Sequence, residues 1–136
     1  MYLLDTVILS ELRKPNSNSN VTSWIARIRP GDLYISVISF MEIERGIERQ
    51  RRIDPAFAVK LEVWLESTLL AFGENILPIS TAGSRLWGRL QTQLGRSDFD
   101  LAIAATAIEH NLHVVTRNTR DYKGVGVAVV NPFAAR

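Results

Sequence analysis

Short apolar runs alternate with helix-like segments along the whole chain of 136 residues. The strand-like runs are residues 2–4, 33–37, 76–79, 113–116 and 127–130. Helices are expected over residues 7–14, 21–29, 39–47, 55–72, 80–94 and 98–111. This alternation is typical of a parallel sheet with helices on both faces. We therefore expect one α/β domain over residues 1–136, a three-layer sandwich with a mainly parallel central sheet.

Composition narrows the class of protein. Hydrophobic residues make up 46% and charged residues 22% of the chain, which excludes a disordered sequence. Cysteine is absent, so disulfide scaffolds, thiolate zinc sites and cysteine nucleophiles are excluded. The chain has no apolar run of the ~20 residues that a membrane span needs, and no basic leader precedes Asp5. We expect a cytoplasmic protein that does not enter a membrane.

Four acidic residues lie where strands end or the next helices begin. Asp5 ends the first strand, and Glu42 falls in the first turn of the helix after the second strand. Asp100 begins the alanine-rich helix, and Asp121 follows the strand that ends at Thr116. Strand ends of a parallel sheet share one edge, so these carboxylates can converge and would need cations to stay ionised. Oxygen ligands select Mg²⁺ or Mn²⁺, ions that activate water and stabilise a phosphoryl transition state.

The same acids also have a structural interpretation. Ser39 and Glu42 have the spacing of a capping box, and so do Ser97 and Asp100. Asp5 can cap the helix that follows it, and acids near helix starts complement the helix dipole. Spacing alone leaves both interpretations open.

Asp98 competes with Asp100 for a place in the site. If the segment is helical, the two side chains point ~160° apart. Below Asp100 the helix face is apolar, through Ile103 and Ala107, whereas the face below Asp98 ends at Glu109. We expect Asp100 to be the ligand and Asp98 to face solvent, as an outer supporting residue.

Motifs occur in series at residues 3–6 and 10–12, 35–43 and 46–47, 100–107, 114–118 and 121–122. Together they resemble the motifs of PIN-domain toxins of the VapC and FitB type, and the resemblance covers essentially the whole chain. It implies a PIN-like fold and a Mg²⁺-dependent endoribonuclease that acts as a toxin. It also implies that Asp5, Glu42 and Asp100 are the core metal ligands.

The fourth ligand differs among members of that family. Some have an aspartate where this chain has Asn118, and others have an acid three residues later, which here is Asp121. We assign Asp121 as the fourth acid. Val7 stands where the family often has an asparagine that braces the pocket. The supporting residues that we expect are Thr6, Asp98, Thr116 and Asn118.

Arginines follow Glu42 along its helix. Arg45 and Arg49 can hold RNA phosphates, and so can Arg117; such contacts position a nucleic acid rather than specify its sequence. Alternatively, the helix arginines pair with Glu44 and neighbouring acids and favour the carboxyl-terminal dipole. We prefer this second interpretation for the helix.

The resemblance further implies a cognate antitoxin as partner, a homodimer, RNA as substrate, and promoter DNA bound through the antitoxin. An alternative function is that of a weakly active or inactive PIN subunit in a DNA-binding regulatory complex, which Asn118 and Val7 leave open. A phosphoaspartate receiver domain fits less well. It needs a lysine near the acids, and Lys123 lies beyond Asp121.

Overall fold

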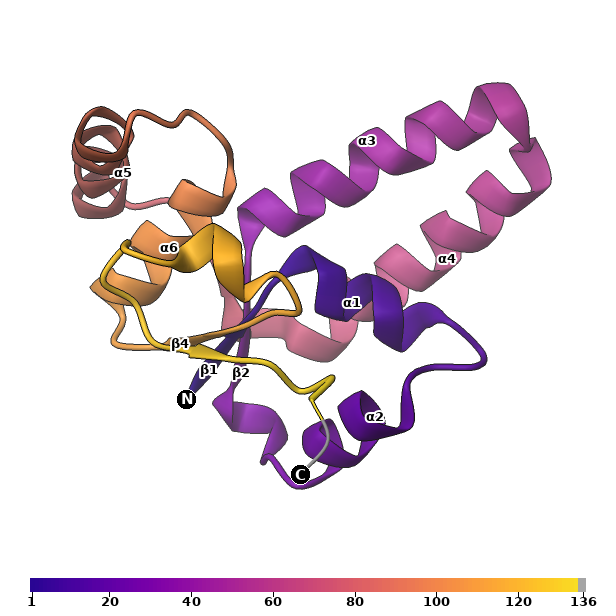
Figure 1. Cartoon of the computed structure of the whole chain (residues 1–136). Helices are drawn as coiled ribbons and strands as arrows, with labels where there is room; N and C mark the ends of the chain where they lie inside the picture. Colours follow the sequence, from indigo (N-terminus) through magenta and orange to yellow (C-terminus); the bar gives the residue numbers. More distant parts are fainter. Residues whose placement is uncertain (135–136) are drawn as a thin grey trace.

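A five-stranded parallel sheet forms the centre of the structure, a computed structural model that describes residues 1–134 (Figure 1). The strands are β1 (Tyr2–Leu4), β2 (Leu33–Ser36), β3 (Ile76–Leu77), β4 (His113–Val115) and β5 (Val129–Val130). Their order is β3-β2-β1-β4-β5, and every neighbouring pair is parallel. The expected α/β sheet is confirmed. Because β1 is central, its carboxyl end lies between the ends of β2 and β4.

The helices are α1 (Thr6–Arg13), α2 (Ser19–Ala26), α3 (Val37–Ile53), α4 (Pro55–Phe72), α5 (Thr81–Leu94) and α6 (Asp100–Glu109). Short 3₁₀ helices are η1 (Pro30–Asp32), η2 (Gly73–Asn75) and η3 (Thr119–Tyr122). Figure 1 shows α3 and α4 side by side as a long arm that extends beyond the sheet. Among the described residues, no helix combines the length and the apolar character needed to cross a membrane.

Two hydrophobic clusters cover the two faces of the sheet. Successive side chains of a strand point to opposite faces, and the buried pairs Leu3–Leu4 and Val114–Val115 divide accordingly. Leu3 and Val114 pack with α5 and α6, whereas Leu4 and Val115 pack with α1, α2, α3 and α4. The result is the three-layer sandwich expected from the sequence.

Both predicted capping boxes are wrong. Helix α3 begins at Val37 and is capped by Ser36, whose Oγ accepts the N–H of Ile38 at 3.0 Å. Glu42 therefore lies in the second turn of α3, not in its first. Helix α6 begins at Asp100 after Phe99, whose side chain makes no capping bond. Asp98 lies outside this helix, so the opposite-face argument does not apply to it.

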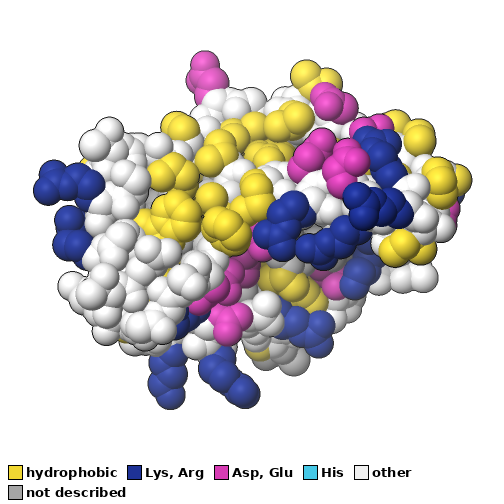
Figure 2. All heavy atoms as spheres, turned by 90° about the horizontal axis from the view of Figure 1, so that it is seen from above, with side chains coloured by type: hydrophobic (Ala, Val, Ile, Leu, Met, Phe, Trp, Pro, Cys, Tyr) yellow, Lys and Arg dark blue, Asp and Glu magenta, His cyan; other side chains and the backbone are white. Residues whose placement is uncertain are grey.

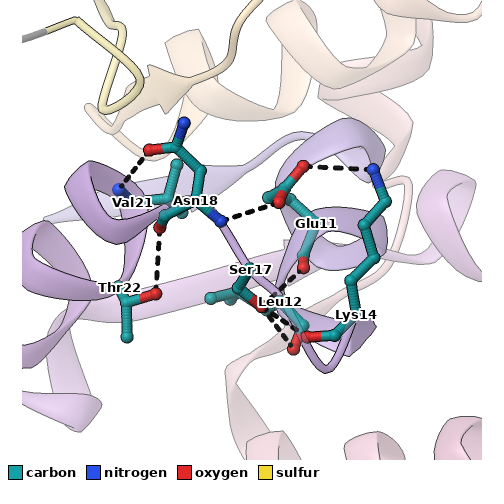
Figure 3. A network of polar contacts seen from close by, with 7 residues as sticks. All are labelled: Glu11, Leu12, Lys14, Ser17, Asn18, Val21 and Thr22. Atoms are coloured by element: carbon teal, nitrogen blue, oxygen red, sulfur yellow. Dashed lines mark hydrogen bonds and ion pairs between the residues drawn. The ribbon is translucent and has the colours of Figure 1, made fainter.

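A polar network fixes the turn between α1 and α2 (Figure 3). The Glu11 carboxylate accepts from Lys14 Nζ at 3.2 Å and from the N–H of Asn18 at 2.9 Å. Asn18 in turn caps α2 by accepting the N–H groups of Asn20 and Val21, so this helix begins at Ser19, two residues before its expected start. The acidic residue of α1 therefore has a structural role in the turn.

Candidate metal centre

Asp5 is held at the carboxyl end of the central strand. Its side chain is only 4% exposed. Oδ1 accepts the N–H of Thr6 at 2.8 Å, and Oδ2 accepts the hydroxyl of Thr116 at 2.8 Å. Burial raises the pKa of Asp5, the two hydrogen bonds oppose this, and the charges of Glu42 and Asp121 raise it further. The helix-capping interpretation of Asp5 is therefore correct, and the same carboxyl also faces the other acids.

Glu42 reaches the same region from α3. Its Oε1 lies 2.8 Å from the hydroxyl of Thr6, which is also 2.8 Å from the hydroxyl of Ser39. A hydroxyl donates one hydrogen bond, so Thr6 can donate to Glu42 while it accepts from Ser39. Ser39 is fully buried. A chain of two hydroxyls thus fixes Glu42 next to the residue that follows Asp5.

Asp100 lies at the first position of α6, above the buried face that includes Ile103 and Ala107. Burial and the charges of the other acids raise the pKa of Asp100 to about 7. The acids that contribute are Asp5, Asp121, Asp98 and Glu42, in decreasing order. Asp100 therefore shares a half-buried region with the carboxylates from β1, α3 and η3.

The structure brings these four acids into one electrostatic cluster, defined as Asp5, Glu42, Asp100 and Asp121. Figure 2 looks onto the molecule from above the view of Figure 1, and acidic side chains gather near the middle of this face with basic side chains on both sides. Within residues 1–134, however, no three Asp, Glu, His or Cys side chains are already at metal-ligand spacing. The four carboxylates are therefore near enough to interact electrostatically but do not form a preorganised ligand set.

The donor set of this cluster fits a hard divalent cation. All donors are carboxylate oxygens, and Mg²⁺ keeps several waters while it binds one or two carboxylates. Close by is the hydroxyl of Tyr122, which is buried without a hydrogen-bond partner among the described residues. Burial raises the pKa of Tyr122, and the four carboxylates of the cluster raise it further. The local excess of negative charge is what a bound cation would neutralise.

The protein-family model for the PIN domain matches residues 2–126. The chain belongs to the PIN-domain family. It is 30% identical to Toxin FitB of Neisseria gonorrhoeae, with 98% of this chain and 99% of that protein covered. It is 31% identical to VapC ribonuclease Y4jK of Sinorhizobium fredii, with 98% of both covered. The resemblance inferred from the motifs is therefore confirmed.

Solved structures agree with this assignment. FitAcB from Neisseria gonorrhoeae superposes with a TM-score of 0.87 at 31% identity and covers 99% of this chain and 100% of that chain. The structure of FitAB bound to an IR36 DNA fragment gives a TM-score of 0.82 at 28% identity, with 100% of this chain and 98% of that chain covered. A toxin–antitoxin complex from Klebsiella pneumoniae gives a TM-score of 0.75 at 27% identity, with 99% of this chain and 100% of that chain covered. The α/β sandwich is thus the PIN fold.

The expected supporting residues of this PIN domain divide into two groups. Thr6 and Thr116 contact the acids directly, through Glu42 and Asp5. Asn118 is exposed and contributes its backbone, since its N–H donates to Thr116 Oγ1 at 2.9 Å. Val7 packs in the hydrophobic cluster around α1 and α3, so it adds no polar group to the site.

Arg96 is a residue of the site that sequence reasoning missed. Its guanidinium donates two hydrogen bonds of 2.8 Å to the carboxylate of Asp98 and a third, also 2.8 Å, to the carbonyl oxygen of Asp121. Asp98 also raises the pKa of Arg96. The only signal in the sequence was its place after Gly95, which ends α5 with a φ of +64°. Asp98 is exposed, as expected, but it lies in the loop before α6 and not on the solvent side of that helix.

The arginines proposed to bind RNA lie in different surroundings. Arg45 and Arg49 line a hollow of about 600 Å³ along α3. Among the described residues, one of the expected pairings with helix acids is present, between Arg51 and Glu48 at 3.0 Å, and Arg51 also pairs with a carboxylate of α4. Arg117 stacks on the ring of Phe133, with 4.7 Å from the guanidinium carbon to the ring centroid.

Proposed function

We propose that this PIN domain is the toxin of a toxin–antitoxin pair, an endoribonuclease that cleaves RNA phosphodiester bonds with Mg²⁺ or Mn²⁺. The observation that carries the proposal is the convergence of Asp5, Glu42, Asp100 and Asp121 from separate elements, in a half-buried region where burial and the neighbouring charges together raise the pKa of Asp100 to about 7. A structural capping role needs no such convergence. The relative Y4jK, which is named a VapC ribonuclease, supports the same activity.

In the proposed reaction, a divalent ion bound by the cluster would activate water and stabilise the charge of the phosphoryl transition state. The residues of this chain hold the ligands in place. Thr116 and the N–H of Thr6 fix the two oxygens of Asp5, and the Thr6 hydroxyl fixes Glu42. Arg96 holds the backbone of Asp121. Asp5 and Glu42 thus keep defined directions, which limits the reorganisation needed during reaction.

The proposed partners follow from the relatives. One is named a toxin, one related structure is a toxin–antitoxin complex, and another contains DNA. We therefore propose that this chain binds a cognate antitoxin in the cytoplasm, forms a homodimer, and contacts promoter DNA through the antitoxin. Light scattering of the chain alone and with the antitoxin encoded next to it measures the stoichiometry.

The decisive experiment incubates the purified chain with RNA in Mg²⁺, in Mn²⁺ and in EDTA. Cleavage in both metals, none in EDTA, and a loss of at least 100-fold for Asp5→Asn are expected. Glu66→Gln, which changes an exposed acid on α4, is the matched control and should cleave like the parent. If the parent does not cleave and still binds promoter DNA with its antitoxin, the regulatory subunit is the correct function. Sequencing of RNA ends after induction in cells then identifies the substrate.

A further inference from the structure

Two adjoining hollows lie along the segment that carries Asp121. The first, of about 280 Å³, is lined by Arg117, Asn118, Thr119, Arg120 and Asp121. The second, of about 470 Å³, shares Thr119 and Arg120 with the first and also includes Lys123, with glycines and valines of the following segment. The surface is therefore concave from the edge of the acidic cluster to Lys123, and it carries a cation at every third residue.

Among the residues that the structure describes, these three cations have no ion-pair partner. Within residues 1–134, no carboxylate oxygen lies within 4.0 Å of the charged nitrogens of Arg117, Arg120 or Lys123. Arg96, on the other side of Asp121, is by contrast paired with Asp98. The pKa of Glu11 is lowered mainly by the N–H of Asn18 and by Lys14. Arg117 is the smallest contributor to this shift, so its charge is not taken up by Glu11. The positive charge of the hollows is thus available for an anion.

The same segment is held in a defined shape. The guanidinium of Arg117 stacks on Phe133, an arrangement that fixes its plane and leaves its N–H groups free to donate at the edges. Backbone bonds from Asp121 to Asn118, 3.0 Å, and from Lys123 to Arg120, 3.3 Å, hold the turn of η3. Arg120 lies within η3, Arg117 lies two residues before it, and Lys123 follows it directly. Arg117 and Arg120 line the first hollow and Arg120 and Lys123 the second, so an extended chain of phosphates can meet them in turn.

We propose that Arg117, Arg120 and Lys123 form a phosphate-binding strip that holds the backbone of single-stranded RNA beside the acidic cluster. This inference rests on the proposed function for the identity of the ligand. Asp121 lines the first hollow together with Arg117 and Arg120, so a strand bound along the strip leads directly to the carboxylates. Contacts of this type grip phosphates and do not select bases, so the strip should bind RNA of any sequence.

The test measures binding apart from cleavage. Asp5→Asn protein in EDTA is titrated into a labelled single-stranded RNA, and anisotropy gives the affinity at several salt concentrations. For single strands, the slope of log K against log salt changes by ~0.7 for each phosphate contact. Arg117→Gln with Arg120→Gln should reduce the slope by ~1.4 and weaken binding about tenfold at low salt, and addition of Lys123→Gln should reduce the slope by ~2.1.

The matched control removes the same charge elsewhere. Arg85→Gln with Arg89→Gln changes two exposed arginines that line a separate hollow on α5 and should leave the slope as in the parent. Melting temperatures of all variants verify that they fold. Single-stranded DNA of the same sequence should lose affinity in parallel, because the strip recognises phosphate in either backbone.

Equal slopes for the strip and control variants would overturn the proposal. It would also be overturned if the strip variants kept RNA binding and lost only antitoxin binding, since the strip would then be a protein-docking surface. The proposed function fails separately. Parent protein that does not cleave RNA in Mg²⁺, combined with a strip-dependent slope in EDTA, would refute the nuclease and leave the strip in place.

Discussion

Asp100→Asn should stabilise the metal-free protein at neutral and alkaline pH. A carboxyl whose pKa rises from 3.8 to about 7 on folding destabilises the ionised folded state by ~4 kcal/mol, since each pH unit corresponds to ~1.4 kcal/mol. Asp100 is half-buried rather than fully buried, and solvent screening reduces the value. Replacing this carboxyl with a neutral amide of the same shape should therefore raise the free energy of unfolding by about 2–4 kcal/mol.

The sign of the pH dependence follows from linkage. Below pH ~4 the carboxyl is protonated in both the folded and the unfolded chain, so parent and variant differ little. Between pH ~4 and ~7 only the unfolded chain ionises, and the parent loses stability as pH rises, whereas Asp100→Asn does not. The free energy of unfolding of the variant should exceed that of the parent by at most ~2 kcal/mol at pH 5, and the difference should reach its full value above pH 7.

The assay is thermal and urea unfolding, followed by circular dichroism in EDTA from pH 4 to 8.5. At ~3–5 °C per kcal/mol for a chain of this size, the melting temperature should rise by roughly 6–20 °C at pH 8. Glu66→Gln, on the exposed face of α4, should show no pH-dependent advantage. A lower melting temperature for Asp100→Asn at pH 8, or a gain that does not grow with pH, would refute the electrostatic crowding of the cluster.

Three further changes test the contacts around the cluster. Asp98→Ala should retain most RNA cleavage, whereas Asp100→Ala should abolish it; cleavage that is lost in Asp98→Ala and kept in Asp100→Ala would show that the wrong acid is assigned to the site. In calorimetry, Arg96→Gln should weaken Mn²⁺ binding more than Asp98→Ala does. Thr116→Val should lower stability by about 1–2 kcal/mol and weaken Mn²⁺ binding, because Asp5 Oδ2 loses its donor; unchanged Mn²⁺ affinity would contradict this role. Tyr122→Phe should leave stability unchanged or raise it by about 1 kcal/mol in EDTA, because it removes a buried hydroxyl that has no hydrogen-bond partner among the described residues. A clear loss of stability would show that the hydroxyl is hydrogen-bonded.

The sheet could be predicted because its signal is local and repeated. Apolar runs such as that of β4 are buried on both faces, and the alternation with helices favours parallel pairing. The boundaries were less predictable, and the start of α3 shows why. Ser36 and Ser39 are both good caps, and the choice depends on where β2 stops pairing. The last paired residue of β2 is Ser36, opposite Leu77 of β3, a contact between residues far apart in the sequence.

The proximity of the four acids could be predicted because each lies within about two helical turns of the end of a strand or the start of a helix, and the shared edge of a parallel sheet brings such positions together. Of the residues that orient them, Thr6 and Thr116 are among the expected supporting residues, and both contact an acid. Ser39 and Arg96 could not be predicted, because their partners are distant in sequence. Ser39 contacts the hydroxyl of Thr6, and Arg96, in the loop after α5, contacts Asp121 of η3. No periodicity relates these positions.

Asp98 shows how a correct prediction can rest on the wrong cause. The sequence argument placed it on the solvent side of a helix, yet α6 starts two residues later and Asp98 has no helix face. It lies instead in the exposed loop between α5 and α6, where Arg96 binds its carboxylate. That ion pair also aims the third N–H of Arg96 at the carbonyl of Asp121. Asp98 therefore acts on the cluster through Arg96, and we expect its removal to weaken the site only as far as Arg96 loses its orientation.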